Sequence, residues 1–324
     1  MRAITQDAYG PLEVLEPTDL PRPVVAPDEV LVEVAAAGLD RGTWHVMHGK
    51  PYLARLALGL RRPRARVPGL DLAGTIVEVG DAVTAWSVGD VVYGIGKGSF
   101  AEYTAANPAK LARRPAGLTD EQAAVVPVSG LTAWQAVTRA GRAEPGHRVL
   151  VTGASGGVGT YAVQVAVALG AEVTAVCSAG KADLVRSLGA THVLDYATDD
   201  LADGTRQYDV IVDIAGNTPL KRLRRTLTPR GRVVIVGGET GGVIAGGLGR
   251  PIWGALTSLL RRQKVIMFLS KETGTDLVPI TDLIESGRLT PVLDTAYPLE
   301  KAADAMAHLE SGRTRGKIAI SVRS

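Results

Sequence analysis

The hydrophobic residues of the chain follow two patterns, and the change lies near residue 120. In the first third, short β-branched runs are interrupted by Gly, Pro and Asp, at Glu29–Leu39, Gly69–Gly80 and Val88–Ile95. Short runs bounded by such residues predict strands. Strands punctuated by glycine at this spacing indicate a curled sheet or a small barrel.

Beyond residue 120, apolar strands alternate with helices. Thr119 and Gln122 have the spacing of a capping box, which predicts the start of a helix. The strands expected after it are His147–Gly153, Glu172–Ser178, His192–Tyr196, Tyr208–Ala215, Arg232–Gly237 and Lys264–Leu269. The helices expected between them are Val158–Leu169, Lys181–Leu188, Pro219–Leu227 and Ile252–Leu260. This alternation predicts an α/β fold with a doubly wound parallel sheet.

The C-terminal tail predicts two helices, DLVPITDLIESGRL and the amphipathic PLEKAADAMAHLESGRTRG, followed by the strand KIAISV. The tail is too short to fold alone, so we expect it to pack on the N-terminal domain. The predicted domains are therefore 1–121 together with 271–324, and 122–270.

Composition narrows the class of protein. The 324 residues suffice for about two domains, and 46% of them are hydrophobic, which excludes wholesale disorder. The net charge of +3 does not indicate nucleic acid, and the single cysteine, Cys177, excludes an intrachain disulfide and a cysteine-rich zinc lobe. The N-terminus lacks a signal pattern and no apolar run reaches about 18 residues, so we expect no membrane span and a cytoplasmic location.

A glycine cluster lies between an expected strand and an expected helix. Ala154-x-Gly156-x-x-Gly159 is the dinucleotide fingerprint with alanine in first place, and a second strand follows about 20 residues on. Small residues let the backbone approach a pyrophosphate, which the helix N-terminus attracts. A glycine-rich turn can also be mere chain geometry, but the strands around it favour a dinucleotide. The expected cofactor contacts are Gly153, Ser155, Gly156, Gly157, Val158 and Gly159.

The end of the expected strand Glu172–Ser178 indicates whether the cofactor is NAD or NADP. Sites that prefer NAD place an acid there for the ribose 2′-hydroxyl, but this strand ends in Cys177 and Ser178. Ser178, Lys181 and Tyr196 offer a hydroxyl, a cation and a phenol that suit a 2′-phosphate. We therefore expect NADPH, although Lys181 could simply begin a solvated helix.

Motifs along nearly the whole chain carry a family resemblance. They are YGPLEVLE, AAAGLD, VPGLDLAGTIVEVG, VGDVVYG, GSFAEY, VSGLTAWQAV, VTGASGGVGTYAVQVA, LGATHVLDY and RGKIAISV. In this order the chain resembles the medium-chain dehydrogenase/reductase superfamily, in its zinc-free quinone oxidoreductase-like branch. The resemblance implies a Rossmann domain inserted into a GroES-like twisted β-barrel domain, and a homodimer.

The places that match zinc ligands of the superfamily hold other residues. Asp40 stands where the zinc enzymes have a ligand cysteine, and Leu70-Asp71 stands where they have His-Glu. Their other ligand cysteine matches a place near Val128, where this chain has no cysteine. Zinc needs about four N, S or O ligands, so we expect no metal. His45 and His48, three residues apart, are the alternative metal-binding pair, but such pairs are common by chance.

Hydride transfer without zinc fits an acceptor that needs no strong polarisation, such as a quinone or an α,β-unsaturated carbonyl. The reaction then needs positioning and a donor for the developing oxyanion. The resemblance implies that Asp40, Tyr52, Ser129 and Thr132 line the cleft and that Gly237 and Gly238 lie under the nicotinamide. We expect Asp40, Tyr52 and Thr132 to be catalytic, with Ser129 and Thr132 also contacting the cofactor.

Two of these roles have alternatives. Asp40 is either a proton relay or the partner of Arg41, and Tyr52 is either a proton donor or a packed aromatic that shapes the substrate site. The role of the basic segment Pro51–Arg66 is left open by the sequence. Its alternatives are a lid, a partner surface, a face toward a membrane or an acidic ligand, and a helix with a solvated edge.

The leading hypothesis is an NADPH-dependent reductase of quinones or α,β-unsaturated carbonyls, with a small apolar substrate. One alternative is an alcohol or ketone oxidoreductase that uses Asp40 or Tyr52 as the acid. Another is a non-catalytic NADPH-binding sensor or scaffold whose partner contact is Leu60–Arg66.

Overall fold

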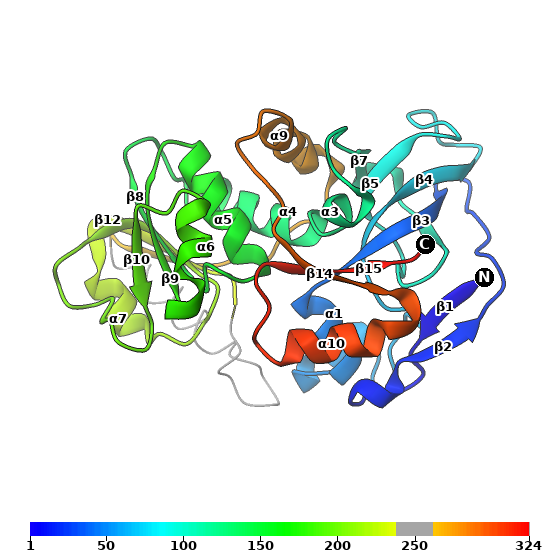
Figure 1. Cartoon of the computed structure of the whole chain (residues 1–324), viewed down its shortest axis with the longest axis horizontal. Helices are drawn as coiled ribbons and strands as arrows, with labels where there is room; N and C mark the ends of the chain where they lie inside the picture. The colour runs from blue at the N-terminus through cyan, green and yellow to red at the C-terminus, as the bar shows by residue number, and fades with distance from the viewer. Residues whose placement is uncertain (238–261, 324) are drawn as a thin grey trace. The chain divides into compact units, whose positions relative to one another are not determined.

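The computed structural model describes residues 1–237 and 262–323, drawn in colour in Figure 1. The chain forms two compact units. Met1–Leu131 with Glu272–Ser324 make the first unit, and Thr132–Lys271 make the second. The helix predicted at Ile252–Leu260 and the predicted cofactor contact Gly238 lie outside the described residues.

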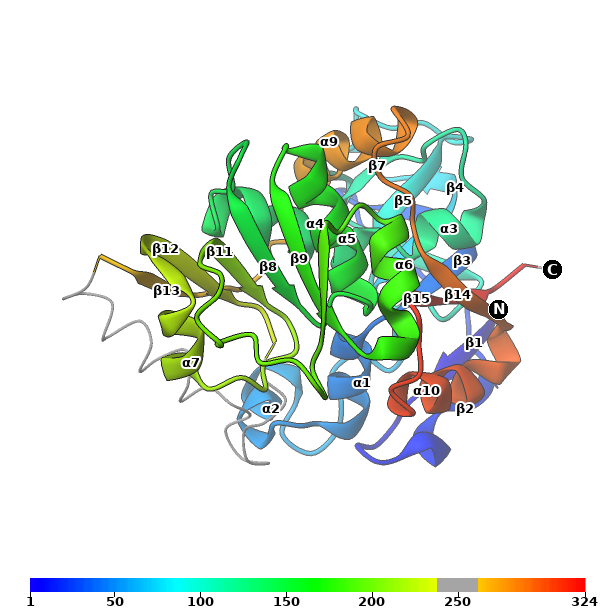
Figure 2. The same cartoon turned by 60° about the vertical axis from the view of Figure 1, so that its left-hand side comes forward.

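The second unit is built on a six-stranded parallel sheet with the order β10-β9-β8-β11-β12-β13 (Figure 2). Its strands are β8 (Arg148–Thr152), β9 (Glu172–Cys177), β10 (His192–Asp195), β11 (Tyr208–Asp213), β12 (Leu227–Ile235) and β13 (Lys264–Met267). The order reverses between β8 and β11, as in a doubly wound sheet. The six predicted strands are confirmed, and β12 begins earlier than predicted because Leu227 already pairs with Tyr208 ahead of a register shift.

In the described part of the second unit, three helices lie between the strands, where the sequence predicts them. They are α5 (Gly157–Ala168), α6 (Ala182–Ser187), preceded by η5 (Ala179–Lys181), and α7 (Leu220–Arg225). Leu150, Ile211, Val233 and Leu223 form the apolar core between sheet and helices. Burial of these aliphatic side chains supplies the main stabilisation of such a layered unit.

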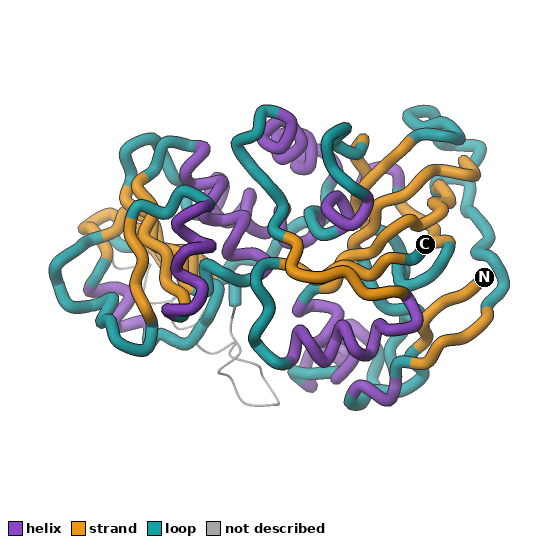
Figure 3. The backbone as a smooth tube through the Cα atoms, viewed as in Figure 1, coloured by secondary structure: helices purple, strands orange, loops and turns teal. Residues whose placement is uncertain are grey.

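The first unit contains a seven-stranded mixed sheet with the order β14-β15-β3-β4-β5-β7, in which β6 also pairs with β3, and a separate pair β1-β2 (Figure 3). The strands are β1 (Arg2–Thr5), β2 (Glu16–Asp19), β3 (Val30–Leu39), β4 (Asp71–Val79), β5 (Val91–Ile95), β6 (Tyr103–Ala106), β7 (Leu111–Arg113), β14 (Leu293–Pro298) and β15 (Lys317–Ser321). Register shifts in β3 bend it. The predicted fold class is confirmed in that a doubly wound parallel sheet forms one unit and a separate mixed sheet forms the other.

Helices of the first unit cover its sheet or link its strands. They are α1 (Arg41–His48), α2 (Arg55–Leu58), α3 (Asp120–Ala124), α9 (Gly274–Glu285), α10 (Ala302–Glu310), and the short η1 (Leu12–Val14), η2 (Tyr52–Ala54), η3 (Pro108–Lys110) and η6 (Leu299–Lys301). The predicted capping box is confirmed: the Thr119 hydroxyl accepts from the Gln122 N–H, and the Gln122 side chain accepts from the Thr119 N–H. Helix α3 packs on β3, β4 and β15, so the first unit extends past residue 121, and α4 (Pro127–Gln135) with η4 (Ala136–Ala140) leads into the second.

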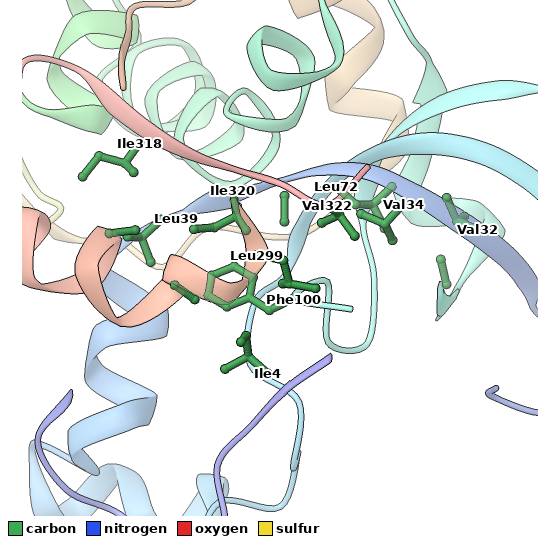
Figure 4. Close-up of a cluster of buried hydrophobic side chains, with 14 of the residues drawn as sticks. Ile4, Val32, Val34, Leu39, Leu72, Phe100, Leu299, Ile318, Ile320 and Val322 are labelled. Atoms are coloured by element: carbon green, nitrogen blue, oxygen red, sulfur yellow. The ribbon is translucent and has the colours of Figure 1, made fainter. Parts of the chain in front are cut away.

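The C-terminal tail packs on the N-terminal sheet, as the sequence predicts. Ile318 of β15 pairs with Leu39 of β3, and Ile320 pairs with Ala37. Figure 4 shows Ile318 and Ile320 in the buried cluster that also contains Phe100. No helix within residues 1–237 and 262–323 is long and apolar enough to cross a membrane.

Candidate functional site

The turn after β8 brings a helix end close to a strand end. Gly153 has a φ of +67°, in the left-handed region, and its carbonyl accepts from the Gly156 N–H at 3.1 Å. A Cβ on Gly159 would lie 2.1 Å from the Gly153 carbonyl oxygen. Only glycine therefore permits this approach of α5 to the turn.

The N-terminus of α5 is open to a ligand. Its N-cap, Gly156, has no side chain with which to form a capping bond. In the part of the chain that the structure describes, Gly156, Gly157 and Val158 are partly exposed, while Ser155 is buried. The first N–H groups of a helix have no partner within the helix and carry a partial positive charge. These groups, beside a turn of small residues, fit the pyrophosphate of a dinucleotide.

A buried hydrogen-bonded pair, which was not predicted from the sequence, connects the ends of β8 and β11. The Thr152 hydroxyl donates to Asp213 Oδ1 at 2.8 Å and accepts from the N–H groups of Ile214 and Ala215 at 3.1 and 3.2 Å. The Gly237 N–H donates to the Asp213 carbonyl at 3.2 Å, and a Cβ on Gly237 would lie 1.9 Å from the Ile214 oxygen. The signal was an acid at the end of the apolar run VIVD.

The residues predicted to contact a 2′-phosphate lie together. The Tyr196 N–H donates to the Cys177 carbonyl at 3.1 Å, and the Lys181 N–H donates to the Ser178 carbonyl at 2.9 Å. The Tyr196 side chain is exposed. Asp195 pairs with Cys177 across β10 and β9, and burial, with a smaller effect of the Asp195 carboxylate, raises the pKa of the Cys177 thiol. Asp195 was not predicted as a neighbour of this site, because it lies on β10 and not at the end of β9.

Asp40 caps helix α1. Its Oδ1 accepts from the Thr43 N–H at 2.8 Å, its Oδ2 accepts from the Thr43 hydroxyl at 3.4 Å, and its side chain is buried. The Arg41 guanidinium lies over the Trp44 ring at 4.3 Å. These contacts give Asp40 the role of N-cap of α1.

Tyr52 lies in η2 and is 46% exposed. The Arg55 guanidinium lies 4.6 Å from the centre of its ring and 4.4 Å from that of Tyr9. The Tyr52 ring thus contacts a cation while nearly half of the residue stays exposed. Among the residues that the structure describes, none makes a contact that assigns a role to the Tyr52 hydroxyl.

Ser129 and Thr132 lie three residues apart on α4 and so share one helix face. Ser129 is buried, and Thr132 is partly buried. The start of this helix is held by Asp71, whose Oδ1 accepts from the Val128 N–H at 2.7 Å. A carboxylate distant in sequence therefore acts as the cap of α4.

Asp71 also forms a fully buried ion pair with Lys317. Lys317 Nζ lies 3.3 Å from Asp71 Oδ2, and the two side chains are 2% and 0% exposed. Burial raises the pKa of Asp71 to about 7, the Lys317 ammonium opposes this rise, and Asp40 adds to it. Lys317 was missed as a site residue, and its signal was a lysine at the start of the apolar strand KIAISV.

The donor set around Asp71 does not fit zinc. The ammonium of Lys317 would repel a cation bound to Asp71, and Leu70 and Val128 offer no side-chain ligand. His45 and His48 are engaged elsewhere, with the Lys50 carbonyl at 3.0 Å and Glu310 at 3.4 Å respectively. Within the described ranges 1–237 and 262–323, no three His, Cys, Asp or Glu side chains gather to hold a metal ion.

The shifted pKa of Asp71 predicts a pH dependence of stability. The folded state keeps the Asp71 proton up to about pH 7, whereas the unfolded chain loses it near the ordinary value of 3.8. Unfolding then releases a proton, so this contribution is complete below about pH 4 and is lost as pH rises through about 7. From this group alone we expect a loss of about 2.5 kcal/mol of unfolding free energy between pH 5 and pH 8.

Urea unfolding at the two pH values measures this loss. The double variant Asp71→Asn/Lys317→Met, which carries neither charge, is the comparison, because all other titrating groups are common to both proteins. A pH dependence that is equal in the wild type and the double variant would contradict the prediction.

Comparison with known proteins extends over the whole chain. Residues 26–116 match the family model of the alcohol dehydrogenase GroES-like domain, and residues 188–320 match that of zinc-binding dehydrogenases. The chain is 32% identical to the chloroplast envelope quinone oxidoreductase homolog of Arabidopsis thaliana, over 99% of this chain and 98% of that protein. It is 31% identical to 2-methylene-furan-3-one reductase of Solanum lycopersicum, over 99% of this chain and 79% of that protein. The solved structure of the Escherichia coli quinone oxidoreductase complexed with NADPH has a TM-score of 0.85, with 26% identity over 99% of this chain and 100% of that one.

Proposed function

Because the chain belongs to the medium-chain dehydrogenase/reductase superfamily, in its quinone oxidoreductase-like branch, we propose that it reduces quinones or α,β-unsaturated carbonyls with NADPH and without zinc. Membership makes it an oxidoreductase with a nicotinamide cofactor, which supplies the hydride. The observation that carries the proposal is the uncapped N-terminus of α5 beside the glycine turn at the end of β8.

The residues of the chain would bind and orient the cofactor. The N–H groups of Gly157 and Val158 would hold the pyrophosphate, and Gly237 leaves room for close approach at the end of β12. The Thr152–Asp213 pair would keep this end of the sheet in place. Ser129 and Thr132 are proposed to contact the nicotinamide or the substrate oxygen, where a hydroxyl can stabilise developing negative charge.

The test of the proposed activity is NADPH oxidation with a panel of simple quinones and enones, with and without a chelator. We expect turnover with at least one acceptor class and no loss on chelation, because the buried Asp71–Lys317 pair disfavours a metal. Bound cofactor without turnover on any acceptor would identify a non-catalytic binder. Stoichiometric zinc that activity requires would reject the zinc-free mechanism.

The preference for NADPH is tested at Lys181. Lys181→Met should raise KM for NADPH by at least about tenfold, because a charge-assisted bond to the 2′-phosphate is lost, and should leave KM for NADH nearly unchanged. Asp195 lies on β10 beside Cys177, and its carboxylate would repel the 2′-phosphate of NADPH. Asp195→Asn should therefore shift the preference further toward NADPH. Equal effects of Lys181→Met on both cofactors would contradict the proposal.

Proton donation by Asp40 or Tyr52 stays a prediction, and the contacts of the two residues favour other roles. Asp40 caps α1 through both oxygens, and Tyr52 packs under Arg55. The conservative variant Tyr52→Phe separates packing from chemistry. We propose that it retains turnover, and an essential donor would instead lose most of kcat with KM unchanged.

A homodimer and a cytoplasmic location are further proposals. Strand β13 lies at the edge of the parallel sheet, and the exposed fractions of Met267 and Leu269 nearby are 57% and 90%. An edge strand with exposed apolar residues is suited to pairing with a second copy. Light scattering tests the dimer, and cell fractionation tests the location.

A further inference from the structure

Three leucines and three arginines are exposed on one segment of the first unit. The leucine–arginine patch consists of Leu53, Leu56, Leu60, Arg61, Arg62 and Arg64. Leu56 and Leu60 are 67% and 68% exposed, and Leu53 is 46% exposed. Single exposed leucines are ordinary, whereas a group of them in one segment marks an interaction surface.

The arginines of the patch are available for a partner. The guanidinium groups of Arg61, Arg62 and Arg64 make no hydrogen bond or ion pair with any described residue, whereas Arg66 binds both oxygens of Asp7 at 2.8 and 2.9 Å. Together with Leu60, these arginines line an open hollow of about 770 Å³. Apolar and cationic side chains therefore meet in the same surface feature.

The local fold fixes the bend that carries Leu60 and the arginines. Gly59, after α2, has a φ of +121°, and the Arg64 N–H donates to the Leu58 carbonyl at 2.7 Å, which closes a tight bend. The Tyr9 hydroxyl donates to the Gly59 carbonyl at 2.6 Å, with the Arg55 guanidinium over the Tyr9 ring. The patch is thus tied to the body of the first unit, near the label α2 in Figure 2.

We propose that the leucine–arginine patch docks on a membrane surface that contains anionic lipids. Such a surface accepts leucines at the level of the headgroups and pairs arginines with lipid phosphates. A free phosphate would leave the leucines in water. A second copy bound through the same patch would bring two sets of arginines together across a two-fold axis. The proposal does not depend on the enzymatic activity.

The experiment is sedimentation with vesicles of phosphatidylcholine alone or mixed with phosphatidylglycerol, at low and high salt. The full chain should bind the mixed vesicles at low salt and lose binding at high salt. Arg61→Gln/Arg62→Gln/Arg64→Gln should weaken the partition about a hundredfold, at roughly fivefold per charge. Leu56→Ser/Leu60→Ser should weaken it about tenfold or more at equal charge.

Controls separate the lipid from other partners. Arg313→Gln/Arg315→Gln removes two exposed charges that do not belong to the patch and should bind vesicles nearly as the wild type does. All variants should keep the wild-type melting temperature and NADPH affinity. The proposal is overturned if the wild type ignores the mixed vesicles, or if inorganic phosphate binds the patch and the leucine variant has no effect. It is also overturned if the leucine variant changes self-association and not vesicle binding.

Discussion

Gly159→Ala is expected to weaken NADPH binding at least a hundredfold. The new Cβ would lie 2.1 Å from the carbonyl oxygen of Gly153, so the first turn of α5 must move away from the turn after β8. The N–H groups at the helix start then lose their place beside the pyrophosphate. Charge-assisted bonds of this kind contribute about 1.5–3 kcal/mol each, so the loss of two gives the expected factor. Fluorescence titration with NADPH measures it.

Two further glycines make this prediction specific. A Cβ on Gly156 would meet the Gly153 oxygen at an ordinary 3.4 Å, so Gly156→Ala should fold normally and bind NADPH about tenfold more weakly, because the methyl group stands where the phosphate approaches. Gly117 has nothing within 4 Å of the added carbon, so Gly117→Ala should match the wild type. If Gly159→Ala binds NADPH as the wild type does, the turn does not hold the cofactor.

Lys317→Met is expected to lower the free energy of unfolding by about 3–5 kcal/mol at pH 8, because it leaves the Asp71 carboxylate buried without its cation. The loss should be smaller at pH 5, where Asp71, with its pKa raised to about 7, holds a proton and needs no cation. Urea unfolding at both pH values measures the difference. Because Asp71 also caps α4 through Val128, the variant should disturb Ser129 as well.

A matched lysine and a double variant test the cause. Lys301 pairs with Asp304 on the surface, where both side chains are about 60% exposed, so Lys301→Met should cost no more than about 0.5 kcal/mol. Asp71→Asn/Lys317→Met removes both charges and keeps an acceptor for the Val128 N–H, so it should recover most of the stability. If the double variant is as unstable as Lys317→Met, lost packing and not the stranded charge is the cause.

Local features of the sequence predicted most of the fold. The strands of the parallel sheet follow from the spacing of their hydrophobic residues and from the residues at their ends. The capping box follows from the three-residue spacing of Thr119 and Gln122. Each of these signals lies within a few neighbouring residues of the chain. The short strands β1, β2, β6 and β7 were not predicted, because they contain only three or four residues and pairing with distant strands forms them.

The glycine turn and its helix belong to the part of the site that the sequence by itself determined, because the turn, the uncapped helix start and the close contact of Gly159 involve neighbouring residues. Only the tertiary structure decided that Asp71, Lys317 and Val128 meet, that Thr152 binds Asp213, and that Asp195 lies beside Cys177. Such contacts join segments far apart in the chain. Their partners are chosen by sheet order and burial, which no local pattern of residues encodes.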